Sequence, residues 1–105
     1  MKTLNQYQKS CLETWEGDYT LPRAVLGICG ESGEVAEVYK KYLRGDYVET
    51  EMIDKIKKEL GDVLFYVATL AYELEISLQE IAEDNISKLS NRKKRGVIKG
   101  SGDER

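Results

Sequence analysis

The sequence predicts an all-α protein, a four-helix bundle that forms an oligomer and ends in a short basic C-terminal tail. Apolar residues recur at helical spacing in four segments, and no segment shows the alternation typical of a strand. The single proline, Pro22, lies where a helix starts, a position that helices tolerate. A length of 105 residues fits one helical domain over 1–95 and a flexible tail over 96–105.

The first two predicted helices have recognisable start and stop signals. The first covers residues 4–15, with apolar residues at helical spacing and Thr3 in position to cap it. A glycine and an aspartate at 17–18 interrupt this pattern. The second covers 22–43, and Gly45 follows it as the residue type that helix C-termini favour.

The third predicted helix covers residues 51–74 and is apolar on two opposite faces. The narrower face consists of Phe65, Ala68 and Tyr72. A helix that is apolar nearly all round is buried from two directions, and in a chain of this size the second is most simply another subunit. The sequence therefore predicts a homodimer or homotetramer. The broader face contains Ile53, Ile56, Leu60, Val63, Leu64, Val67, Leu70 and Leu74.

The fourth predicted helix opens with a capping-box sequence. Ser77 and Glu80 have the spacing at which each side chain can bond the other residue's backbone N–H. The helical pattern continues to about Arg92. Residues after Gly96 read as a mobile tail or as a segment that a ligand orders.

Small residues within these helices predict close packing. Gly33 and Gly61 lie inside helices, where glycine costs about 1 kcal/mol relative to alanine. This cost suggests a close approach of another backbone, although a helix can simply tolerate a glycine. Cys11 and Cys29 lie among apolar neighbours and are predicted to be reduced core thiols of a cytoplasmic protein.

Targeting and membrane segments are not expected. Residues 1–10 lack the apolar region of a signal peptide. The longest apolar stretch, 63–74, is interrupted by a threonine and a glutamate and is shorter than the roughly 20 residues that span a membrane. We therefore expect no membrane partner.

The composition excludes several catalytic classes, because the chain contains no histidine. Serine and cysteine nucleophile systems that depend on histidine are excluded, as are zinc sites that contain it. The Glu-x-x-His signature of ferritin-like di-iron proteins is excluded as well. Carboxylate, lysine, arginine and tyrosine remain for chemistry.

Charge is distributed unevenly along the chain. Residues 1–87 carry nine basic and 17 acidic side chains, whereas residues 88–99 carry six basic side chains and no acidic one. An acidic body beside a basic segment can bind cations in one place and phosphate in the other. Nucleic acid is not expected as a partner, because the pI is about 5.1 and the basic run contains no aromatic residue.

Two pairs of acidic residues suggest a metal site. Glu31 and Glu34 stand three residues apart in the second predicted helix, and Glu59 and Asp62 repeat this spacing in the third. Each pair lies at the border of its apolar face, so two packed helices can bring four carboxylates together. Their repulsion would require a cation, and oxygen ligands favour Mg²⁺ or Mn²⁺. The alternative is that such pairs arise by chance on a solvated helix face.

These motifs together resemble a known family. Glu31-x-x-Glu34, then Glu59-x-x-Asp62 and a downstream Asn85-x-x-Lys88-Leu-x-x-Arg92, are similar to the MazG-like nucleotide pyrophosphohydrolases. The resemblance covers roughly residues 20–95. It implies an α-helical bundle that assembles as a dimer or tetramer and hydrolyses nucleoside triphosphates to monophosphate and pyrophosphate with Mg²⁺.

The resemblance also implies roles for individual residues. The four acids of the two pairs would be the magnesium ligands, and Tyr66 would lie near them. Asn85, Lys88 and Arg92 would face the phosphates or sugar of the nucleotide. Many relatives carry a further glutamate where this chain has Gly30, which leaves the metal count and the general base open.

Aromatic residues offer two interpretations. Trp15 and Tyr19 can stack on a nucleobase, whereas Trp15, at the end of an amphipathic helix, also suits the core.

Three functional readings remain open at this point. The first is a Mg²⁺-dependent nucleoside triphosphate pyrophosphohydrolase, the second a phosphoribosyl-ATP pyrophosphohydrolase, and the third a non-enzymatic helical oligomer or adaptor whose acids are merely surface residues. The sequence does not distinguish base or sugar preference.

Overall fold

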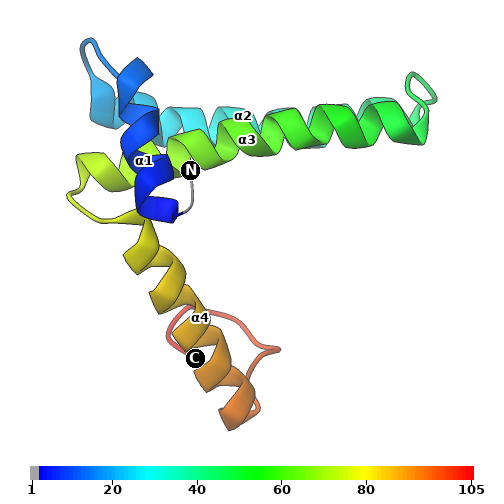
Figure 1. Cartoon of the computed structure of the whole chain (residues 1–105). Helices are drawn as coiled ribbons and strands as arrows, with labels where there is room; N and C mark the ends of the chain where they lie inside the picture. Colours follow the sequence, from blue (N-terminus) through cyan, green and yellow to red (C-terminus); the bar gives the residue numbers. More distant parts are fainter. Residues whose placement is uncertain (1–2) are drawn as a thin grey trace.

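The protein is described by a computed structural model, in which the described residues are 3–105, and Met1 and Lys2 of the N-terminal stretch lie outside them. The expected all-α class is confirmed, because these residues form helices and no strand (Figure 1). The elements are α1 (Leu4–Cys11), a 3₁₀ turn (Leu12–Thr14), α2 (Thr20–Leu43), α3 (Glu49–Glu73) and α4 (Leu78–Arg95). No helix within this range is long and apolar enough to cross a membrane.

The two long helices α2 and α3 pack side by side as a hairpin (Figure 1). Gly45 has a φ of 95° in the connection between them, a conformation that glycine adopts at little cost. Helix α1 crosses one end of the hairpin and packs on α3. Helix α4 contacts α1 and α3 and then projects away from the hairpin, so the four helices of one chain form an open arrangement.

The helix starts follow the predicted capping. The Thr3 hydroxyl accepts a hydrogen bond from the Gln6 backbone N–H at 3.1 Å, and the Gln6 side chain accepts one from the Thr3 N–H at 3.0 Å. The Ser77 hydroxyl accepts from the Glu80 N–H at 3.0 Å. Helix α2 begins two residues before Pro22, which lies in the first turn, where its missing N–H leaves no helical bond unmade.

Gln8 joins three segments in the small core. Its side chain donates to the carbonyl oxygens of Ala68 at 3.1 Å and Ile76 at 3.0 Å, and it accepts from the Leu78 N–H at 3.0 Å. Gln8 is buried, so these bonds satisfy polar groups that water does not reach. Helix α1 is thereby fixed to the end of α3 and the start of α4. The surrounding apolar side chains are Leu4, Tyr7, Cys11, Phe65, Val67, Ala68 and Leu78.

The two cysteines differ in their surroundings. Cys11 is buried in this core, as predicted. The prediction for Cys29 is wrong, because Cys29 is exposed. It lies on a face of α2 that no other helix of the chain covers, which helical spacing alone does not reveal.

The apolar faces of α3 also differ from expectation. Phe65 and Ala68, on the face expected to meet a partner, pack in the core beside α1. On the broader face, Ile53 is 55% exposed and Leu60 is 54% exposed, so the expectation that this face forms the chain's own core is wrong for these residues. The helices available within one chain do not reach this part of the hairpin.

One chain exposes more surface than a compact domain of its size. Its accessible surface is 7796 Å², whereas a compact protein of this mass exposes about 6,000 Å². Its radius of gyration is 16.5 Å, compared with about 13 Å for a compact domain of this length. The hairpin and α4 therefore leave long apolar faces without a covering layer in the single chain.

The closest packing of another side chain against a glycine of α2 occurs at Gly27, a position that was not predicted from the sequence. A Cβ atom at Gly27 would lie 2.4 Å from ring atoms Cδ1 and Cε1 of Tyr66. The expectation of close approach at Gly33 and Gly61 is wrong within this chain, since a Cβ there would have no described atom within 4 Å beyond the adjacent residues and the helix's own nearby backbone. Gly27 is therefore the position on α2 at which a side chain would clash with Tyr66.

We expect Gly27→Ala to lower the free energy of unfolding by about 1–3 kcal/mol, because the added methyl group overpacks the contact with Tyr66. Gly33→Ala is the matched control on the same helix, and the better helix propensity of alanine should raise the stability by up to about 1 kcal/mol. Urea denaturation at one fixed protein concentration measures both. Equal changes at the two positions would contradict the assigned contact.

Candidate metal centre

Three carboxylates meet where α2 faces α3. Glu31 comes from α2, and Glu59 and Asp62 come from α3, where they stand one turn apart. One oxygen from each lies within 4.8 Å of the others. Glu31 and Glu59 are half-buried and Asp62 is exposed, so the group lies at an open edge of the hairpin. The spacing of the two acidic pairs predicts that four carboxylates come together, and three of them do so here.

Glu34, the fourth predicted ligand, lies one turn further along α2. It is exposed and is not one of the three residues whose oxygens converge. Its charge still acts on Glu31, as one of the interactions that raise the pKa of that residue. With Glu59 it borders a neighbouring cleft of about 260 Å³ between the two helices.

The surroundings of Glu31 disfavour its charged form. The pKa of Glu31 is raised, first by desolvation, then by a hydrogen bond to Glu59 and by the negative charges of Asp62, Glu59 and Glu34. Desolvation and like charges both favour the protonated carboxyl. A bound divalent cation would reverse this preference, because it replaces repulsion with attraction to all the oxygens.

The donor set suits a hard cation. All three converging groups offer carboxylate oxygen, and the chain contains no histidine that would attract a softer metal. Mg²⁺ and Mn²⁺ bind such oxygen ligands and leave positions open for water or phosphate. The residues present therefore fit a divalent cation of this class.

An aromatic cluster lies beside the acids. Tyr66 is one turn beyond Asp62 on α3, and its ring packs edge-on against Trp15 at 6.2 Å and Phe65 at 5.2 Å between centroids. Trp15 is half-buried, and its Nε1 atom is buried without a hydrogen-bond partner among the described residues. The guanidinium of Arg23 lies 4.8 Å above its ring. Trp15 therefore packs against α3 through its contact with Tyr66.

Two residues beside the site, Tyr7 and Lys58, were not predicted from the sequence. Tyr19, which was considered as a partner for a nucleobase, lies away from the site. Tyr7 of α1 lies close enough to Asp62 to feel its charge, although burial is the main reason that the pKa of Tyr7 is raised to about 12. Lys58 borders the cleft that Glu34 and Glu59 share, and its position next to Glu59 in the sequence was an available signal. Tyr19 is 80% exposed, outside the aromatic cluster.

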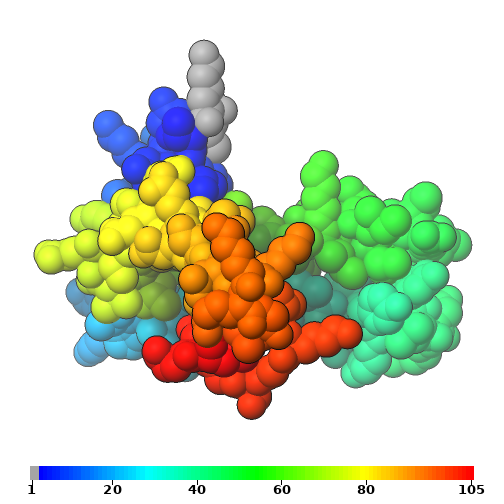
Figure 2. Space-filling view, turned by 90° about the horizontal axis from the view of Figure 1, so that it is seen from below, coloured from blue at the N-terminus to red at the C-terminus, as the bar shows by residue number. Residues whose placement is uncertain are grey.

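The predicted phosphate-binding residues lie on a different element. Asn85 and Lys88 border a cleft of about 400 Å³ along α4, and Arg92 follows one turn later. Because α4 leaves the hairpin, a single chain does not bring these residues beside the carboxylates (Figure 1). In the view from below, much of the α2–α3 hairpin extends to one side, clear of α4 (Figure 2).

Comparisons with known proteins find a matching family model and similar sequences. A family model described as the MazG nucleotide pyrophosphohydrolase domain matches residues 20–97, which include both acidic pairs and the motif on α4. The chain is 45% identical over 87 residues to the Gene 37 protein of Mycobacterium phage L5, a match that covers 81% of this chain and 76% of the phage protein.

A second relative is less similar. The chain is 36% identical over 78 residues to the uncharacterized protein YpjD of Bacillus subtilis (strain 168), covering 72% of this chain and 70% of that protein. No solved structure gives a significant match. The family model covers most of the chain, and this chain therefore belongs to the MazG nucleotide pyrophosphohydrolase family.

Proposed function

We propose that the protein hydrolyses nucleoside triphosphates to the monophosphate and pyrophosphate with Mg²⁺, or Mn²⁺ in its place. The observation that carries this proposal is the convergence of Glu31, Glu59 and Asp62 within 4.8 Å on the hairpin of a MazG-family chain. In this reaction a water oxygen bonds to the α-phosphorus and the bond from that phosphorus to the α–β bridging oxygen breaks. Pyrophosphate is the leaving group.

The carboxylates are proposed to hold the cation. Glu31, Glu59 and Asp62 supply converging oxygens, and Glu34 lies one turn away, where it can act on the metal or on its bound water. When bound, the metal supplies charge neutralisation on the triphosphate and a water of lowered pKa. Desolvation and the charges of neighbouring acids raise the pKa of Glu31, and a bound cation would offset this cost, which supports the role.

Aromatic and basic side chains are proposed to bind the rest of the nucleotide. Trp15 and Tyr66 lie beside the acids and offer ring surface to a base. Asn85, Lys88 and Arg92 supply one hydrogen-bonding and two cationic groups for phosphate or sugar. Arginine and lysine suit this role because metal ions and phosphate clamps together neutralise a triphosphate.

We propose that the working enzyme is a homodimer or homotetramer. One chain exposes apolar side chains along the hairpin and along α4, including Ile53, Leu60 and Ile86. A second copy would cover these faces. It would also allow α4 of one subunit to approach the carboxylates of another, which a single chain does not achieve.

A panel assay tests the proposed activity. The full chain is incubated with Mg²⁺ and each NTP and dNTP, and the products are separated by chromatography. Monophosphate plus pyrophosphate, lost on addition of chelator, is the expected result. Diphosphate plus phosphate would contradict attack at the α-phosphorus. If no nucleotide turns over, phosphoribosyl-ATP becomes the next substrate to assay, and failure there would favour a non-enzymatic oligomer.

Glu59→Gln should lower kcat/KM by at least about 100-fold, because it removes a metal-binding charge and little volume. The helical circular dichroism spectrum should not change. Glu49→Gln, an exposed acid on the same helix, is the matched control and should retain wild-type activity. Full activity of Glu59→Gln would refute the assigned metal centre.

Ile53→Lys should shift the assembly toward monomer, since a charge on the exposed apolar face opposes its burial. Sedimentation velocity over a range of concentrations measures the shift. Thr50→Lys places the same charge at an exposed polar position one turn away and should leave the assembly intact. A wild-type chain that sediments as a monomer at all concentrations would refute the oligomer.

A further inference from the structure

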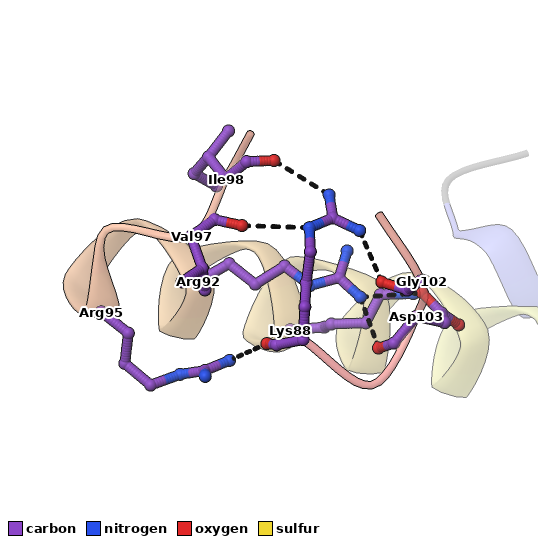
Figure 3. Close-up of polar contacts among 8 residues, drawn as sticks. Lys88, Arg92, Arg95, Val97, Ile98, Gly102 and Asp103 are labelled. Atoms are coloured by element: carbon purple, nitrogen blue, oxygen red, sulfur yellow. Dashed lines mark hydrogen bonds and ion pairs between the residues drawn. The ribbon is translucent and has the colours of Figure 1, made fainter. Parts of the chain in front are cut away.

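The two cations of the α4 motif are already paired with an anion from the same chain. The Asp103 carboxylate accepts hydrogen bonds from Lys88 Nζ at 2.8 Å and from Arg92 Nη2 at 2.9 Å (Figure 3). Arg92 Nη2 also donates to the backbone carbonyl of Asp103. Lys88 and Arg92 lie one turn apart on α4, so a single anion can reach both.

The segment that delivers Asp103 has a defined conformation. Gly96 ends α4 with a φ of 72°, and Gly102 has a φ of 84° just before Asp103. Arg105 donates to the carbonyl oxygens of Val97 at 3.0 Å and Ile98 at 2.9 Å (Figure 3). Residues 97–105 therefore fold back along α4 as a strap, defined here as the C-terminal strap.

The C-terminal strap places an anion beside the two cations of α4, although the Asp103 side chain itself is 74% exposed. Arg92 is only 5% exposed, although it lies in the basic last turn of α4. A buried guanidinium requires a partner of opposite charge, and the Asp103 carboxylate supplies it. The pKa of Asp103 is lowered to about 2 by its bonds to Lys88 and Arg92, so the carboxylate is charged at neutral pH.

We propose that Asp103 occupies the phosphate-binding site of Lys88 and Arg92 in cis, so that the C-terminal strap is an autoinhibitory contact displaced by a phosphoryl anion. The ligand class is the triphosphate of a substrate or the pyrophosphate that hydrolysis releases. This inference rests on the phosphate role assigned above to the two cations. The family model ends at residue 97, the first residue of the strap, so residues 98–105 lie outside the matched region.

Competition between the two anions has a physical basis. A carboxylate offers one negative charge, whereas pyrophosphate offers several charges and more acceptor oxygens to the same cations. The strap occupies the site in some of the molecules, and only the remaining fraction can bind phosphate. The apparent affinity for phosphate is reduced in proportion to that fraction. A change that opens the strap therefore tightens phosphate binding without adding a contact.

Calorimetric titration of inorganic pyrophosphate into the full chain, with chelator present, tests the proposal independently of the metal centre. Asp103→Asn keeps the shape of the side chain and removes its charge, and it should bind pyrophosphate about tenfold more tightly than wild type, a shift of about 1.4 kcal/mol. Glu104→Gln removes the neighbouring charge of the same strap. Glu104 has no described bond to α4, so this variant should bind pyrophosphate with the affinity of wild type. Adding Lys88→Met to Asp103→Asn should abolish the gain.

Amide NMR relaxation provides the second readout. Saturating pyrophosphate should make the Ser101 and Glu104 amides of the wild-type chain mobile on the nanosecond timescale. Absence of binding to any variant, equal affinities for Asp103→Asn and Glu104→Gln, or unchanged strap amides at saturation would each overturn the proposal. Loss of turnover in the panel assay alone would refute the proposed enzyme and leave these binding results unaffected.

Discussion

The contact between Gly27 and Tyr66 sets the register on which the candidate site depends. The ring of Tyr66 occupies the space that a side chain at position 27 would need. Glu31 is one turn after Gly27 on α2, and Asp62 is one turn before Tyr66 on the antiparallel α3. Packing the ring on the glycine therefore brings the two carboxylates opposite each other, with Glu59 one further turn along. A single steric fit thus aligns the acids of both helices.

This alignment concentrates negative charge at an otherwise simple hairpin. The pKa of Glu31 is raised because burial and neighbouring acids disfavour its charged form. The free energy of unfolding therefore falls as the pH rises and Glu31 loses its proton. The small core around Gln8 lies at one end of the hairpin and does not cover the rest of it. In the single chain, the acids therefore lie at an open edge of the hairpin, and apolar side chains such as Ile53 and Leu60 remain exposed along it.

The family motif is divided between two arms of the molecule. Its acidic half belongs to the hairpin, and its basic half belongs to α4, which departs from the hairpin after its first turns (Figure 1). The basic half is engaged by Asp103 of the C-terminal strap (Figure 3). The positive and negative groups of the motif therefore lie on separate arms of a single chain.

The helices, their caps and the acidic pairs could be predicted from the sequence, because these features depend on neighbours within one or two turns. Thr3 and Ser77 cap their helices as predicted, and Glu59 and Asp62 share a face because three residues nearly complete a turn. Which faces would be covered depended on the approach of distant segments. Helix periodicity could not reveal that Cys29 is exposed, or that Gly27 rather than Gly33 meets another helix. Those contacts arise from how whole helices pack against one another, so they became apparent in the three-dimensional structure and not before.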